Sequence, residues 1–218
     1  MLNPQLLNLL GNALWETIYM VGISLILSIL IGIPVGILLV ISSPGHIRPN
    51  ASLYNVLSII VNVGRSLPFI ILLVAIIPFT RFVVGTSIGT AGAIVPLTIG
   101  SIPFLARVVE SAVLEVDWGV IEAAQAMGST TWQIIAKVLI PESISGLILG
   151  ITLTTVSLVS YSAMAGAVGG GGLGDLAIRY GYQRFRGDIM LATIIILVIL
   201  VQGMQSLGNW LARRLSSH

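Results

Sequence analysis

The stretch from Ser143 to Val168 reads SISGLILGITLTTVSLVSYSAMAGAV and contains no charged residue. A helix needs about 20 predominantly apolar residues to cross a bilayer, and this stretch is long enough. The composition of the whole chain agrees, because 56% of its residues are hydrophobic and only 8% are charged. A soluble domain carries about 25% charged residues, which its surface requires. The sequence therefore predicts an all-α membrane protein.

Four further apolar stretches surround the first one. Three precede it and one follows it, and each is interrupted by few charged residues. We expect five transmembrane helices at about 17–40, 56–78, 90–109, 143–168 and 189–212, in a single transmembrane domain that covers residues 1–218. A long polar segment, Glu110 to Glu142, separates the third stretch from the fourth.

The basic residues predict the orientation of the chain. No Lys or Arg precedes the first apolar stretch, whereas His46 and Arg48 follow it, and Arg213 and Arg214 end the fifth. Cytoplasmic segments carry the excess of basic residues. We therefore expect an external N-terminus, a cytoplasmic C-terminus and a cytoplasmic segment 110–142. A cleavable signal peptide would need a basic region before its apolar core, so we expect the first stretch to remain as a span.

The polar segment 110–142 has the pattern of two short helices. Asp117 is a typical N-cap residue, and Gly128 suits the left-handed position that ends a helix. Thr130 followed by Gln133 has the spacing of a capping box that opens a second helix. Pro141 then ends that helix and can open the next span.

One motif in this segment resembles a known family. Glu122-Ala123-Ala124, then Gly128, then Ile140-Pro141 is similar to the EAA loop of ABC-importer permeases, with Ile140 in place of the usual leucine. The stretches Arg65–Gly89 and Tyr161–Phe185 resemble the permeases of methionine importers. The similarity covers most of the chain from about Gly32 onward.

This resemblance implies a type I ABC importer permease fold and transport of methionine, and it leaves open whether D-methionine is carried as well as L-methionine. It further implies a homodimer, two cytoplasmic ATPase subunits and an external substrate-binding lipoprotein. The helix with Glu122, Ala123, Ala124 and Gly128 would be the coupling helix that docks on the ATPase. From the pattern alone, an amphipathic surface helix with a glycine stop is the alternative.

The sequence offers no catalytic chemistry of its own. A phosphate loop needs GxxxxGK[ST], and Lys137, the only lysine, is not in such a motif. HExxH and GxSxG motifs are missing, as is cysteine. A net charge of +2 with scattered basic residues does not indicate nucleic-acid binding. We therefore predict no enzyme activity, no cofactor and no metal site.

Five residues are candidates for the substrate pathway. Arg65 lies inside a predicted span, where a charge costs roughly 2.5–3.5 kcal/mol on insertion scales, so it should face a cavity or a polar partner. The alternatives for Arg65 are snorkelling toward the cytoplasmic side and a structural bond to backbone carbonyl groups. The fourth span is rich in hydroxyl groups, and its candidates are Ser160, Tyr161, Ser162 and Met164. Hydrogen bonding between helices is the alternative for these residues.

Glycine spacing predicts where helices approach closely. The pairs Gly32/Gly36 and Gly146/Gly150 have GxxxG spacing, which suits close helix contacts. The run Gly166 to Gly174 predicts a flexible, closely packed external turn.

Two other functions fit the sequence less well. A permease for another amino acid, glycine betaine or a phosphonate would share the fold and the coupling loop. A membrane-embedded enzyme or assembly subunit is more remote, because an intramembrane enzyme should have paired carboxylates or a His/Asp cluster within its spans. The acids of this chain lie at span ends or in loops.

Overall fold

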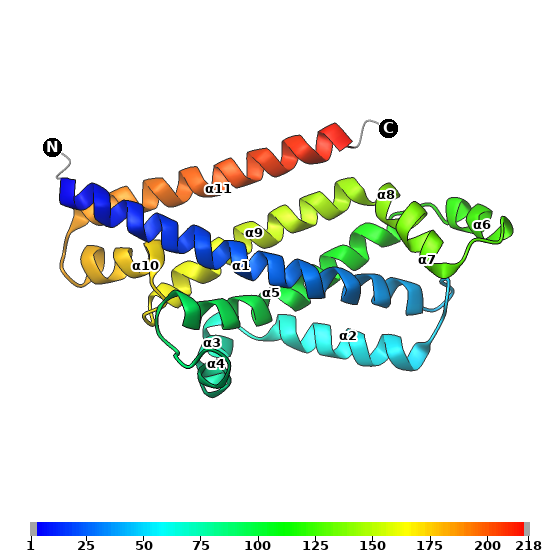
Figure 1. Cartoon of the computed structure of the whole chain (residues 1–218), viewed down its shortest axis with the longest axis horizontal. Helices are drawn as coiled ribbons and strands as arrows, with labels where there is room; N and C mark the ends of the chain where they lie inside the picture. The colour runs from blue at the N-terminus through cyan, green and yellow to red at the C-terminus, as the bar shows by residue number, and fades with distance from the viewer. Residues whose placement is uncertain (1–3, 216–218) are drawn as a thin grey trace. The chain divides into compact units, whose positions relative to one another are not determined.

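The computed structural model describes residues 4–215, and the regular structure in this range is helical throughout (Figure 1). The prediction of an all-α fold is confirmed. The α-helices are α1 (Pro4–Ser42), α2 (Ala51–Ser66), α3 (Phe69–Ala75), α4 (Ile77–Val84), α5 (Gly89–Leu114), α6 (Trp118–Ala126), α7 (Thr131–Ile134), α8 (Ile140–Glu142), α9 (Ile144–Gly166), α10 (Gly172–Leu176) and α11 (Gly187–Leu215). Two π-helical segments are η1 (Ile135–Leu139) and η2 (Ala177–Tyr182).

Four of these helices are long and apolar enough to cross a membrane. They are α1, α5, α9 and α11, and a fifth span results if α2 and α3 are counted together. These helices include the predicted spans 17–40, 90–109 and 189–212 and nearly all of 143–168. Helix ends do not mark the surfaces of a bilayer, so the span bounds stay a prediction.

The range 56–78, predicted as one span, is not one helix. It is divided among α2, α3 and α4, with breaks at Pro68 and Ile76. Pro68 precedes α3 as its N-cap and has no N–H group to continue a helix. Pro78 occupies the first turn of α4, where a missing N–H costs nothing. Gly85, with φ of 77°, then ends α4 in the left-handed conformation.

The described residues form two compact units. Unit 1 comprises 4–27, 67–101 and 155–205, and unit 2 comprises 28–66, 102–154 and 206–215. Each of the helices α1, α5, α9 and α11 contributes one part to each unit.

Unit 1 is built on an apolar core from α1, α3, α5 and α9. Met20, Leu97 and Leu158 are completely buried in it, together with Phe69. The ring of Phe69 stacks on Tyr161 with centroids 4.6 Å apart. The short helix α3 therefore belongs to this core through the side chains of Phe69 and Leu73.

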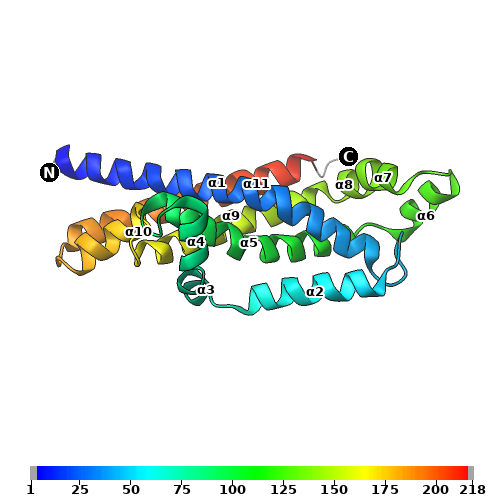
Figure 2. The same ribbon diagram turned by 60° about the horizontal axis from the view of Figure 1, so that its bottom comes forward.

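Unit 2 is organised around the last turns of α5. A Cβ atom at Gly36 would lie 2.6 Å from the carbonyl oxygen of Ala106, and one at Gly150 would lie 2.5 Å from Val108. Gly32 and Gly146 approach Leu105 and Ala112 in the same way, and Figure 2 shows α1, α2 and α9 beside α5 in this part. The close contacts predicted from both GxxxG pairs are confirmed, and in each pair the partner is α5.

Candidate coupling site and translocation path

The first short helix of the segment 110–142 is α6, and its ends match the predicted caps. The carboxylate of Asp117 accepts a hydrogen bond from the N–H of Gly119 at 2.6 Å. Gly128, just after the C-cap Met127, has φ of 76°, a conformation that a residue with a side chain rarely adopts. Both cap predictions are confirmed.

The second short helix begins with the predicted capping box. Thr130 Oγ1 accepts from the N–H of Gln133, and Gln133 Oε1 accepts from the N–H of Thr130 at 2.8 Å. The helix does not stop after α7, because it continues through η1 and α8 to Glu142. Pro141 was predicted to end this second short helix. It lies instead in the first turn of α8, and the helical segment continues past it to Glu142.

The apolar faces of α6 and α7 fix the loop to its own subunit. Ile121 and Ala124 are 1% and 3% exposed, and they pack with Val109 and Val113 of α5 in one buried cluster. Ile134 at the end of α7 belongs to the same cluster. The loop is therefore not a free connection but is seated on the end of α5.

The four motif residues divide between the two faces of α6. Ala124 points into the core of its own subunit, whereas Glu122 and Ala123 are exposed, as is Gly128 in the following turn. Of the two alanines, only Ala123 lies where a partner can contact it. Met127 and Trp132 also expose large apolar side chains, 79% and 72% respectively.

The candidates for the substrate pathway are not gathered on one surface. On α9, Ser160 is exposed and Met164 is 46% exposed, but Ser162 is buried and donates to the carbonyl oxygen of Val159 at 2.7 Å. Tyr161 is held by its stack on Phe69. The hydroxyl group of Ser162 is therefore satisfied within α9 itself, and this bond is not one of the bonds between helices that were the alternative for these residues.

Arg65 belongs to unit 2, and the α9 candidates belong to unit 1. It lies in the last turn of α2 and is exposed. No ion pair is formed by Arg65 with any residue in the range 4–215.

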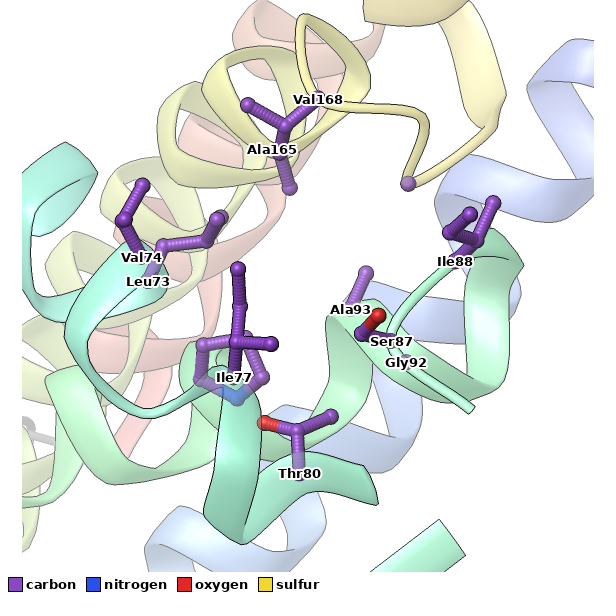
Figure 3. Close-up of a pocket in the computed structure, with 12 residues that line it drawn as sticks. Leu73, Val74, Ile77, Thr80, Ser87, Ile88, Gly92, Ala93, Ala165 and Val168 are labelled. Carbon is purple, nitrogen blue, oxygen red and sulfur yellow. The ribbon is translucent and has the colours of Figure 1, made fainter. Parts of the chain in front are cut away.

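Unit 1 contains an apolar cavity of about 200 Å³ (Figure 3). Leu73 and Ile77 point into it from α3 and α4, and it is also lined by Ala165 near the end of α9 and by Val168 in the turn after α9. Its lining has the hydroxyl groups of Thr80 and Ser87 but no charged side chain. A zwitterionic ligand would find no ionic partner there.

The glycine run between α9 and α10 is closely packed, as expected. Gly172 N–H donates to Glu16 Oε2 at 2.7 Å, and Leu173 N–H donates to Thr17 Oγ1 at 2.9 Å. Gly89 N–H also donates to the carbonyl oxygen of Gly169 at 2.8 Å. Glu16 and Thr17 of α1 thus hold the run in place, a role that sequence analysis did not predict.

Sequence analysis also missed a polar network between α2 and α5. Arg107 Nη1 donates to Glu110 Oε2 at 2.5 Å, and its Nη2 donates to Asn62 Oδ1 at 2.7 Å and to Ser58 Oγ at 3.1 Å. Tyr54 Oη donates to Glu110 Oε1 at 3.5 Å. The available signal was the spacing of Tyr54, Ser58 and Asn62, which places three polar groups on one face of α2.

Comparison with known proteins identifies the family. Residues 28–217 match the family model described as "Binding-protein-dependent transport system inner membrane component". The chain is 54% identical over 207 residues to a probable D-methionine transport system permease protein of Vibrio cholerae, covering 95% of this chain and 92% of that protein. It is 55% identical over 158 residues to the D-methionine transport system permease protein of Escherichia coli K12, covering 72% and 73% of the two chains.

Solved structures agree with this assignment. A chain of the MetNI methionine ABC transporter in an inward-facing conformation superposes with a TM-score of 0.96 at 50% identity, covering 98% of this chain and 99% of that chain. A chain of an amino acid ABC transporter, with a TM-score of 0.78 and 19% identity, shares the fold. The loop geometry, the sequence identity and the family model lead to one conclusion: the chain belongs to the family of binding-protein-dependent transport system inner membrane components.

Proposed function

We propose that this chain is the membrane permease of an ATP-driven methionine importer and carries methionine into the cytoplasm by alternating access. The names of its relatives motivate D-methionine as well as L-methionine as cargo. The chain works as a homodimer with two ATPase subunits, which hydrolyse the ATP, and it receives its cargo from an external substrate-binding lipoprotein.

The observation that carries this proposal is the division of α6 into two faces. Ile121 and Ala124 anchor the helix to α5, and Glu122 and Ala123 are exposed beside Met127. A loop that presents large apolar side chains outside a lipid-buried span is typical of a protein interface. A rigidly seated helix with such a face can receive force from a partner and pass it into the membrane domain.

In the proposed mechanism, ATP closes the two ATPase subunits and brings the two coupling helices together. The permease dimer then opens outward and receives methionine, and hydrolysis lets it return to the inward-open state. The driving free energy is the differential affinity of the ATPases for ATP in the two states. It reaches the permease through α6 and the end of α5.

We place the coupling loop and the C-terminus in the cytoplasm and the N-terminus outside. Arg213 and Arg214 in the last turn of α11 support this orientation, as does the lack of Lys and Arg before Arg48. On the pathway, Ser160 and Met164 are the α9 candidates that remain accessible, and Arg65 is the accessible cation at the end of α2.

A charge reversal and an enlarged side chain on the exposed face of α6 test the coupling role. In proteoliposomes that contain the whole complex, Glu122→Lys and Ala123→Trp should lower methionine uptake about fivefold or more while ATP hydrolysis continues. Glu115→Lys is the matched control, because Glu115 is an exposed acid of the same loop outside α6. Wild-type uptake in both α6 variants would contradict the assignment of the coupling helix.

The orientation is tested with a single cysteine. The chain has no cysteine of its own, so Glu115→Cys introduces the one thiol of the chain at an exposed position of the same loop, outside the face of α6 that would dock on the ATPase. A membrane-impermeant maleimide should label it in inverted vesicles and not in intact cells. Labelling in intact cells alone would place the loop outside and overturn the proposed topology.

A further inference from the structure

Helix α2 presents a polar stripe along one of its sides. Tyr54, Ser58 and Asn62 follow each other at intervals of one turn and face the same side. The opposite side of α2 exposes apolar side chains such as Val56, Ile60 and Val63. A stripe of this kind in a lipid-embedded helix needs a polar partner.

Two charged residues of α5, one turn apart, supply that partner. Arg107 uses one terminal nitrogen for Glu110 and the other for Ser58 and Asn62, while Glu110 also accepts from Tyr54. The side chain of Glu110 is 4% exposed and that of Arg107 is 22% exposed. We call these five residues the α2–α5 network.

The same turns of α5 carry the coupling loop on another side. Val109 and Val113 pack against Ile121 and Ala124 of α6, whereas Arg107 and Glu110 bind α2. The stretch from Arg107 to Val113 therefore contacts both α6, the helix that would receive the force, and α2.

The chemistry of the network suits the transmission of a displacement. Apolar helix contacts allow small sliding motions, because one methyl group replaces another at little cost. A guanidinium group that binds three acceptors has one arrangement, and separating a buried charge from its partner is strongly unfavourable. The network therefore holds α2 and α5 in one register.

We infer that Arg107 and Glu110 are positioning residues that make α2 move with α5 when the coupling loop is displaced. This inference rests on the proposed function of the chain as an importer permease. Through this connection, a movement of α6 reaches the end of α2 at Arg65 and the break at Pro68, after which α3 begins. Without the network, apolar contacts such as those of Val61 with Ala106 and of Gly64 with Pro103 would still join α2 to α5, but α2 would follow the movement of α5 less closely.

The test measures the number of methionine molecules taken up for each ATP hydrolysed in proteoliposomes that contain the whole complex. Glu110→Gln keeps the shape of the side chain and removes its charge, and Arg107→Lys keeps the charge and removes the planar fork. Both variants should retain ATP hydrolysis and lower the uptake per ATP about fivefold or more. Asp188→Asn is the matched control, because Asp188 forms an exposed ion pair with Arg186, and its ratio should equal that of the wild type.

A second pair of variants approaches the network from α2 and avoids the buried charges. Asn62 is exposed, so its replacement leaves the core intact. Asn62→Leu removes one of the three acceptors of Arg107 and should lower the uptake per ATP. Asn62→Asp restores an acceptor for Arg107 and should bring the ratio back toward that of the wild type.

The outcomes separate the network from the proposed function. If the wild-type complex shows no ATP-dependent methionine uptake, the proposed function fails and the inference falls with it. If the wild type couples normally and the Glu110, Arg107 and Asn62→Leu variants keep its ratio, the inference alone is overturned. A loss of uptake and ATP hydrolysis in strict proportion to the amount of assembled complex would show a purely structural role and would also overturn it.

Discussion

The α2–α5 network and the glycine run between α9 and α10 join helices in opposite ways. In the network, long charged side chains bridge α2 and α5, and the contact depends on charge and hydrogen bonds. In the glycine run, backbones approach so closely that no side chain fits, as at Gly166 beside Gly174 and Asp175. The α2–α5 network should tolerate changes in side-chain volume but not the loss of a charge. The glycine run should tolerate the loss of a charge but not an increase in side-chain volume.

The largest effect should follow from removing the cation of the network. Arg107→Ala leaves Glu110 buried without a counter-charge, which should lower the free energy of unfolding by about 3–5 kcal/mol. Denaturant unfolding of the purified protein in detergent micelles measures this loss. Arg186→Ala, in contrast, should leave stability unchanged, because its ion pair with Asp188 is exposed on both sides. Equal effects of Arg107→Ala and Arg186→Ala would show that burial of the Arg107–Glu110 ion pair does not contribute to the free energy of unfolding.

A smaller effect should follow from adding one methyl group to the glycine run. The Cβ atom of Gly166→Ala would overlap the backbone nitrogen of Asp175 and lie 2.6 Å from the carbonyl carbon of Gly174. Backbone atoms cannot turn aside as a flexible side chain can, so the helices must move apart. We expect a loss of about 1–3 kcal/mol, measured by the same unfolding assay.

The control for this change is a glycine with free space around it. Gly22 in α1 has no atom within 4 Å of the position of a Cβ atom. Gly22→Ala should therefore cause no loss and should stabilise the helix by up to about 1 kcal/mol. Similar losses at Gly166 and Gly22 would mean that close approach is not what holds the run together.

The same two regions indicate which features can be read from a sequence. The caps at Asp117, Gly128 and Thr130 and the two GxxxG pairs were predicted correctly, because each depends on a local pattern of a few residues. The glycine run was also recognised as a close contact. The general architecture follows from the apolar stretches, three of which lie within α1, α5 and α11 and one of which nearly coincides with α9.

Features that depend on residues distant in the sequence were not predicted. The position of Arg107 in the third predicted span and that of Asn62 in the second gave no sign that the two side chains meet across α2 and α5. In the same way, nothing near Glu16 shows that it accepts from Gly172, 156 residues later. The break of the second span at Pro68 was a local feature that could have been predicted, because two prolines lie within that stretch.

The smallest effect concerns His46, whose ring lies at the junction of the coupling loop with the link between α1 and α2. The ring packs edge-on against Trp118 with centroids 5.4 Å apart, and burial lowers the pKa of His46 below its ordinary value of 6.5. The unfolded chain therefore binds the proton more readily than the folded protein does. As the pH falls from 6.5 toward the lowered pKa, the unfolded state gains protons first and the free energy of unfolding decreases.

His46→Phe keeps an aromatic ring against Trp118 but cannot be protonated, so its stability should fall less than that of the wild type between about pH 7.5 and about pH 5.5. Unfolding curves of both proteins across this range measure the difference, and parallel curves would mean that the burial of His46 is not linked to the stability of the coupling loop.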